Sequence, residues 1–284
     1  MNIAIFGLGL IGGSLGRALI KFTDNTVFGR DIDESVMLKA ELLGVYNKPL
    51  LDEDLSTQDI VVFSLPPVAT IEVMAEICPK LKSGAIVIDT CGIKRIVVDK
   101  MRQLNAIYPS LRFVGVHPMA GREFSGVAHS TATLFENAYI IMTAVTNDIE
   151  TLHTIKKLFI EIGAQDVTIC SAEKHDKMIS YTSQLAHIVS SSYIKNSKSH
   201  CHAGFSAGSF RDMTRVAKLN PQLWTELFMD NRDNLIGDID ELVLRLQEYR
   251  EALNCQDQAK LCDLLADGVK QKEEAENARK ERLK

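Results

Sequence analysis

The sequence predicts an α/β protein in two parts, a doubly wound parallel sheet over residues 1–170 and an all-helical domain over residues 171–284. In the first part, short apolar runs alternate with helical stretches, which is typical of strands joined by crossover helices. A glycine-rich turn follows the first of these runs. After residue 170 the short runs give way to helical periodicity, and 284 residues are enough for two domains.

Composition limits the kinds of partner. With 46% hydrophobic and 24% charged residues, the chain is typical of a soluble globular protein. A formal net charge of −5 disfavours a nucleic-acid partner, which would need a basic face. No apolar run approaches the roughly 18 residues that span a bilayer. The strand-like start at Met1 leaves no room for a signal peptide, so we expect a cytoplasmic protein without membrane contact.

Cysteine and histidine spacing gives no framework for disulfides or metal. The six cysteines are scattered without a Cys-x-x-Cys pair and indicate reduced thiols. His200-Cys201-His202 is a dense cluster of potential ligands, but adjacent residues rarely coordinate one ion. We therefore predict no metal site.

The first apolar run, residues 3–6, leads into Gly7-Leu8-Gly9-Leu10-Ile11-Gly12 and then into helical spacing. A strand, Gly-x-Gly-x-x-Gly and a helix in this order predict a Rossmann-type dinucleotide-binding domain. Gly7 allows the tight turn, Gly9 lets the backbone approach a pyrophosphate, and Gly12 lets helix and strand pack closely. The strand at 26–31 ends in Asp31, nineteen residues past Gly12, where a carboxylate can bind the ribose hydroxyls.

These residues favour NAD as the cofactor. Asp31 would repel a 2′-phosphate, whereas Arg30 leaves NADP open because an arginine can receive that phosphate. We expect Arg30 instead to stack on the adenine or to lie in solvent. Ser64-Leu65-Pro66 stand where the strand at 59–65 stops, and should form a loop near the cofactor. Further strands are expected at 85–89, 112–117, 138–143 and 166–170, with helices at 69–81 and 149–163.

His117 closes the strand that begins at Arg112, and Pro118 and Gly121 turn the chain after it. Ligands bind at the carboxyl ends of strands in an open α/β sheet. An imidazole, with an ordinary pKa of about 6.5, can take up a proton there. A loop histidine that merely caps a strand is the alternative.

In the helical part, a helix is expected over residues 173–195, carrying His175 and His187. Twelve residues of α-helix would place them about 120° apart around the axis and about 18 Å apart along it, so they could not share a ligand atom. Asp212 and Arg215 should share a face of the next helix, either as a solvated ion pair or as an arginine held for a carboxylate. A later stripe suggests a helical dimer interface: Leu235, Ile239, Leu242, Leu246 and Tyr249.

Taken in order, these residues resemble the prephenate/arogenate dehydrogenase family of tyrosine biosynthesis. The resemblance rests on the glycine motif, on His117-Pro118-Met119-Ala120-Gly121-Arg122-Glu123-Phe124-Ser125-Gly126, and on three later stretches, His175-Asp176 with His187, Phe210–Arg215 and Asn220–Trp224. It implies a homodimer that oxidatively decarboxylates prephenate to 4-hydroxyphenylpyruvate and reduces NAD+. Arogenate, which would give tyrosine directly, is the alternative substrate.

The resemblance also implies roles for residues. His117 would be the base or hydrogen-bond acceptor for the substrate hydroxyl, Arg215 would bind a substrate carboxylate, and His187 would contact the substrate side chain. Glu123 and Asp212 would form an ionic network around the entrance, with Ser125 among the substrate-binding residues.

Two features depart from the family pattern. Members commonly carry a serine that bonds the catalytic histidine, but Gly92 stands at that position, so Thr90, Cys91 or water would supply the bond. We also expect no regulatory domain after the helical part, so feedback by tyrosine would act at the active site. Two rivals remain, a β-hydroxyacid dehydrogenase using Lys174, Lys177 or Lys195, and a non-catalytic NAD-binding sensor.

Overall fold

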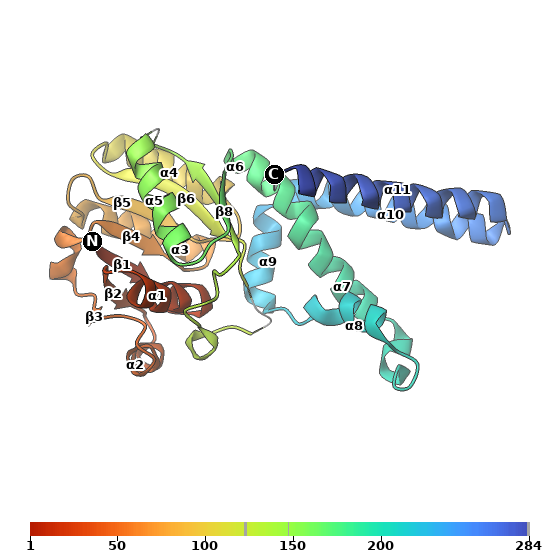
Figure 1. The fold of residues 1–284 in the computed structure, drawn as a ribbon, viewed down its shortest axis with the longest axis horizontal. Coiled ribbons are helices and arrows are strands. Elements are labelled where there is room, and N and C mark those ends of the chain that lie inside the picture. The colour runs from red at the N-terminus through yellow and green to blue at the C-terminus, as the bar shows by residue number, and fades with distance from the viewer. Residues whose placement is uncertain (122–123, 147, 283–284) are drawn as a thin grey trace. The chain divides into compact units, whose positions relative to one another are not determined.

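The computed structural model describes residues 1–121, 124–146 and 148–282. These residues contain an eight-stranded sheet in the order β3-β2-β1-β4-β5-β6-β7-β8 (Figure 1). The strands are β1 Asn2–Phe6, β2 Thr26–Arg30, β3 Lys48–Pro49, β4 Ile60–Phe63, β5 Ile86–Asp89, β6 Arg112–Pro118, β7 Tyr139–Ala144 and β8 Asp166–Ile169.

The sheet is parallel from β3 to β6, as predicted, but β7 pairs antiparallel with β6 and parallel with β8. The connection explains this reversal. A parallel return needs a crossover of a dozen or more residues, usually an α-helix. The described part of the segment between β6 and β7 holds the short 3-10 turn Val127–His129 and no α-helix, which fits an antiparallel return.

Helices cover both faces of the sheet because its inner strands, such as β1, are apolar on both sides. In β1, Ile3 and Ile5 join one buried cluster, whereas Ala4 and Phe6 join another. This alternation is the period of two that every strand imposes on its side chains. The helices that follow or separate these strands are α1 Leu10–Phe22, α2 Glu34–Leu42, α3 Pro67–Ile77, α4 Arg95–Ile107 and α5 Ile149–Glu161.

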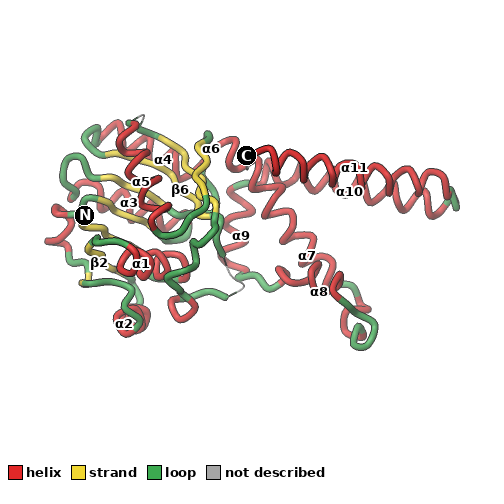
Figure 2. The backbone as a smooth tube through the Cα atoms, viewed as in Figure 1, coloured by secondary structure: helices red, strands yellow, loops and turns green. Residues whose placement is uncertain are grey.

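After β8 the chain is helical (Figure 2). Its helices are α6 Ala172–Ile179, α7 Ala186–Ile194, α8 Gly208–Thr214, α9 Pro221–Asp230, α10 Arg232–Asn254 and α11 Gln258–Arg282. The predicted order of a doubly wound sheet followed by helices is thus confirmed. In the described part of the chain, no helix is long and apolar enough to cross a membrane.

Contacts divide the chain into two compact units, Met1–Arg232 and Asp233–Lys284. The first unit therefore includes α6 to α9 as well as the sheet, and the predicted domain boundary after residue 170 stays a prediction. Within the second unit, the hydroxyl of Tyr249 on α10 donates to the carbonyl of Leu264 on α11 over 3.2 Å. Leu246, on the predicted apolar stripe, is 59% exposed.

A π-helical segment, Ser180–Leu185, joins α6 to α7. The residues on either side of it keep right-handed helical angles, so residues 172–194 form one continuous helix. A π-bulge accommodates one extra residue without turning the flanking helix. His175 and His187 are then separated by about 20° around the axis. The predicted separation of about 120°, which assumed an unbroken α-helix, is wrong.

Candidate active site

The turn after β1 leaves no room for a side chain at Gly7 or Gly12, but its backbone is open at Gly9. Gly7 has φ +86°, and a Cβ there would lie 2.5 Å from the carbonyl oxygen of Ser64. A Cβ at Gly12 would lie 1.9 Å from the carbonyl oxygen of Gly7, which no side chain can accept. At Gly9, in contrast, no heavy atom would come within 4 Å of a Cβ, so this backbone is open.

Helix α1 begins directly after Gly9, and Gly9 offers no side-chain cap to its first turn. The first N–H groups of a helix lack partners within the helix and bind anions well. Asp31, just past β2, accepts the N–H of Leu8 at 2.8 Å, which holds its carboxylate against the turn. An open glycine turn, a helix N-terminus and a fixed carboxylate together fit a dinucleotide.

The loop after β4 completes this cradle. Leu65 packs against Gly7, Ser64 accepts a hydrogen bond from the hydroxyl of Thr90 at 3.0 Å, and Pro66 is the N-cap of α3. Arg30 forms an ion pair with Asp52 at 2.6 Å, and its side chain is 43% exposed. The structure therefore brings together, at the carboxyl ends of β1, β2 and β4, the residues predicted to bind the cofactor.

His117 lies at the carboxyl end of β6 and is the first member of a hydrogen-bonded chain. Its Nδ1 is 2.8 Å from Nε2 of His175, and Nδ1 of His175 is 2.6 Å from Oδ1 of Asp176. His175 and Asp176 are buried in α6, whereas His117 is partly exposed. The described residues provide no hydrogen-bond partner for Nε2 of His117, so this atom can meet a substrate.

A buried ion pair lies close to this chain. The ammonium of Lys94 contacts Oδ2 of Asp89, and both side chains are fully buried. Asp89 also accepts the N–H of Cys91 at 2.9 Å and that of Val116, the residue before His117, at 3.2 Å. The pair therefore fixes the strand that presents His117 and places a positive charge near both histidines.

Burial and this charge keep the two rings neutral. Burial lowers the pKa of His117 well below its usual value, and His175 and Lys94 lower it further. Burial also lowers the pKa of His175, although its hydrogen bond to Asp176 opposes the change. At neutral pH, His117 is therefore an uncharged imidazole that can accept a proton.

A second cluster surrounds His187 in α7. Its Nδ1 donates to the carbonyl oxygen of Val216 over 3.1 Å, and its ring centroid lies 4.0 Å from that of Trp224. Burial lowers the pKa of His187, the Val216 carbonyl opposes this, and the positive charge of Arg215 lowers the pKa further. His187 and Arg215 are thus neighbours, as a shared substrate pocket would require.

The predicted pairing of Asp212 with Arg215 is not formed. Helix α8 ends at Thr214, and Arg215 begins the 3-10 turn Arg215–Ala217. Asp212 is exposed, and the structure records no ion pair for it within the described residues. Ser125 lies in an exposed loop, and Glu123 lies outside the residues that the structure describes.

Helix α9 connects the two clusters along one face. Trp224 contacts His187, the carbonyl of Leu227 accepts from Gln184 at 2.9 Å, and Asn231, the C-cap, donates to the carbonyl of Asp176 at 2.9 Å. Seven residues separate Trp224 from Asn231, which corresponds to about 10 Å of helix. The two clusters therefore lie about that far apart along α9.

Comparison with known proteins decides the family. The nucleotide-binding domain of prephenate dehydrogenase matches residues 15–168, and the dimerization domain of prephenate dehydrogenase matches residues 171–267. The chain belongs to the prephenate dehydrogenase family. This confirms the resemblance drawn from the sequence and makes the protein an oxidoreductase of that family.

This chain is similar to members of the family over most of its length. The chain is 33% identical to cyclohexadienyl dehydrogenase of Zymomonas mobilis, over 90% of this chain and 89% of that protein. It is 30% identical to prephenate dehydrogenase of Bacillus subtilis, over 90% of this chain and 71% of that protein. The solved structure of Aquifex aeolicus prephenate dehydrogenase with hydroxyphenyl propionate and NAD+ has a TM-score of 0.80 and 26% identity, and the alignment covers 97% of this chain and 98% of that one.

The family serine has no direct replacement among its neighbours. Gly92 stands at the position that the resemblance predicts for this serine. Thr90 donates its hydroxyl to Ser64, and the thiol of Cys91 lies 3.4 Å from both the carbonyl of Leu65 and the hydroxyl of Thr70. Burial raises the pKa of Cys91, so this thiol stays protonated. In this structure the histidine is held instead by His175.

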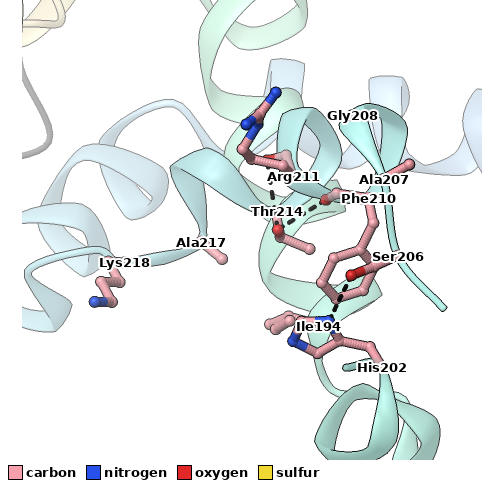
Figure 3. A pocket seen from close by; sticks show the side chains of 10 residues that line it. All are labelled: Ile194, His202, Ser206, Ala207, Gly208, Phe210, Arg211, Thr214, Ala217 and Lys218. Carbon is pink, nitrogen blue, oxygen red and sulfur yellow. Dashed lines mark hydrogen bonds between the residues drawn. The ribbon is translucent and has the colours of Figure 1, made fainter. Parts of the chain in front are cut away.

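Two further features lie outside the family pattern. The three lysines of a β-hydroxyacid dehydrogenase mechanism, Lys174, Lys177 and Lys195, are all exposed. A cavity of about 640 Å³ beside α8 is shown in Figure 3, where the ring of Phe210 stacks on His202 with 4.5 Å between centroids. Its lining excludes His117, His187 and Arg215 and consists of Ile194, His202, Ser206, Ala207, Gly208, Phe210, Arg211, Thr214, Ala217 and Lys218.

Proposed function

We propose that this protein is an NAD+-dependent prephenate dehydrogenase that forms 4-hydroxyphenylpyruvate and CO2. The observation that carries the proposal is the place of His117 at the carboxyl end of β6, with Nδ1 bound to His175 and Nε2 unpaired within the described residues. Family membership supports the reaction class. The nucleotide-binding domain and the NAD+ in the Aquifex structure support NAD as the cofactor.

Bound NAD+ supplies the hydride acceptor for C4 of the substrate. Gly7 to Gly12, Asp31 and the loop Ser64-Leu65-Pro66 would hold it, because they form the open cradle described above. Asp31 disfavours a phosphate on the ribose. Arg30 is already held by Asp52, which also favours NAD over NADP.

His117 stabilises the charge that develops on the substrate hydroxyl. As C4 loses hydride, its hydroxyl becomes strongly acidic, and a neutral imidazole within hydrogen-bond reach can accept the proton. Loss of the ring carboxylate as CO2 then makes the ring aromatic, and the proton ends on the phenolic oxygen. A charged imidazolium could not act in this way, so the lowered pKa of His117 suits the role.

Substrate binding is assigned to the second cluster. Arg215 is a donor suited to a substrate carboxylate, and His187 and Trp224 offer an aromatic surface beside it. Glu123 and Asp212 are proposed at the entrance, and Ser125 among the substrate-binding residues, on the basis of the resemblance alone. The dimerization domain at residues 171–267 supports a homodimer formed through the helical part, and a cytoplasmic location stays a prediction.

Arogenate is the second candidate substrate. It carries the same cyclohexadiene ring, with an amino group where prephenate has a keto group. The name cyclohexadienyl dehydrogenase, given to the Zymomonas relative, describes that shared ring and favours keeping both substrates in the test.

The experiment is NADH formation by purified protein with NAD+ and either prephenate or arogenate. Turnover with one of them establishes the reaction, and the ratio of the two kcat/KM values assigns the substrate. His117→Asn is the control variant: NAD+ binding should persist while turnover collapses. No turnover with either substrate, in protein that binds NAD+, would replace the proposal by a non-catalytic NAD-binding sensor.

A further inference from the structure

The hydrogen-bonded chain behind His117 ends in a carboxylate that meets only donors. Oδ1 of Asp176 accepts the N–H of Lys94 at 2.7 Å and Nδ1 of His175 at 2.6 Å. Oδ2 accepts the N–H of Arg95 at 2.9 Å and its Nε at 3.3 Å. Burial raises the pKa of Asp176, but the hydrogen bonds from His175 and from the two backbone N–H groups outweigh it and hold the pKa below its usual value.

An ionised Asp176 determines where each ring proton lies. A carboxylate only accepts, so Nδ1 of His175 must carry a proton. The neutral ring has one ring proton, which leaves Nε2 of His175 as an acceptor. At 2.8 Å from that atom, Nδ1 of His117 must then be the donor, and Nε2 of His117 is left without a proton.

We propose that His175 and Asp176 are positioning residues that hold His117 in the tautomer whose Nε2 accepts the proton of the substrate hydroxyl. The effect on turnover rests on the proposed dehydrogenase function. The position of the ring proton on His117 does not, because it is a property of the free protein. The opposite tautomer would present N–H to the hydroxyl and could not act as an acceptor.

The surroundings of Asp176 keep this chain rigid. Asn231 donates to the carbonyl of Asp176 at 2.9 Å and to Oε1 of Gln184 at 2.8 Å, and Arg95 donates to Oδ1 of Asn231 at 3.0 Å. Asp176, Gln184 and Asn231 are buried. The charged groups that face the two rings are Asp176, Lys94 and Asp89, and Lys94 lowers the pKa of both rings.

Asp176→Asn reverses the tautomer while it keeps the shape. An amide nitrogen at the Oδ2 position would face two donors of Arg95, neither of which can become an acceptor. At the Oδ1 position it faces one such donor, the N–H of Lys94, and also the ring of His175, which can accept. The nitrogen therefore turns toward His175, the ring proton moves to Nε2 of His175, and His117 becomes protonated on Nε2.

The first measurement is the tautomer itself, by long-range ¹H–¹⁵N correlation of histidine-labelled protein, with His117→Asn used to assign the signals. We expect the Nδ1–H form of His117 in the wild type and the Nε2–H form in Asp176→Asn. An Nε2–H tautomer of His117 in the wild type would overturn the proposal. The wild-type measurement needs no substrate. Its outcome therefore depends neither on the dehydrogenase assignment nor on whether the variant folds.

Kinetics give the second reading. With prephenate, Asp176→Asn should lower kcat by about 10⁴-fold, as the same exchange does behind the histidine of a serine protease. The KM and the Kd for NAD+ should change less than about threefold, because the tautomer affects only proton acceptance. Asn231→Ala is the matched control. It removes the hydrogen bond from Asn231 to the carbonyl of Asp176 but leaves the carboxylate of Asp176 bound to His175. If its kcat fell as far while the tautomer stayed unchanged, Asp176 would have a merely structural role and the proposal would be wrong.

Discussion

Removing the cation of the buried Lys94–Asp89 pair should strongly destabilise the protein. Both side chains are fully buried, and Asp89 would keep only the N–H groups of Cys91 and Val116 as donors. The Lys94 side chain packs closely on Gly115, since a Cβ added at Gly115 would lie 3.0 Å from Cδ of Lys94. Lys94→Met retains an aliphatic chain at this contact. Breaking a buried pair by removing one partner costs about 3–5 kcal/mol, because the remaining charge is uncompensated. At about 2–4 °C per kcal/mol, Tm should fall by about 6–20 °C.

The same substitution should change the pH dependence of turnover. Burial, His175 and Lys94 all lower the pKa of His117, so deleting the Lys94 charge raises that pKa. At a given acidic pH, more of the His117 ring is then protonated and unable to accept a proton. The acid limb of kcat/KM should therefore move to higher pH, while the plateau above it is kept.

Thermal unfolding followed by circular dichroism and a pH profile of NADH formation measure the two effects. Lys82→Met is the matched control, because it breaks a 2.6 Å pair with Asp59 in which both side chains are 38% exposed. Such a pair contributes at most about 1 kcal/mol, and this control should leave the acid limb in place. The reasoning fails if both variants lose the same stability, or if Lys94→Met titrates like the wild type.

Two further substitutions test the contacts that α9 makes with the nucleotide-binding part. Glu226 accepts the N–H of Val68 at 2.7 Å and so caps the first turn of α3. Glu226→Ala should therefore lower the free energy of unfolding by about 1 kcal/mol, measured by urea titration. An unchanged urea midpoint would show that this cap does not stabilise the protein. A Cβ on Gly92 would lie 3.7 Å from Leu227, so Gly92→Ser should keep its stability within about 0.5 kcal/mol and raise kcat by supplying the hydrogen bond of the family serine. A lower kcat would contradict the second expectation.

The nucleotide cradle could be predicted from sequence because its requirements are local. The spacing of Gly7, Gly9 and Gly12 follows from one turn between one strand and one helix, and the distance to Asp31 follows from the length of that helix and the next strand. The wholly apolar run at residues 3–6 similarly predicts a parallel strand that is buried on both faces. Each of these signals lies within about 30 residues of chain, where secondary structure fixes the geometry.

The chain behind His117 could not be predicted in this way. His117 and His175 are 58 residues apart, and Asp176 is 82 residues from Lys94, so no local period links them. Only a weak signal was present. Asp89 and Lys94 lie in a largely apolar stretch, and ionisable residues in such a stretch are rarely fully buried unless they are paired. That signal indicates a buried ion pair but does not show which neighbouring strand hydrogen-bonds to it.

The π segment shows how one extra residue determines the relation between the two clusters. On an unbroken α-helix, His175 and His187 would point in directions about 120° apart, and one of them would face away from α9. The π segment absorbs a residue, so both rings lie on nearly one side of the helix, where α9 meets Asp176 through Asn231 and His187 through Trp224. Nothing in Ser180–Leu185 distinguishes a π turn from an α turn by composition. Because π-bulges carry a cost and occur frequently at functional sites, its position between these two histidines favours one active site that both of them serve.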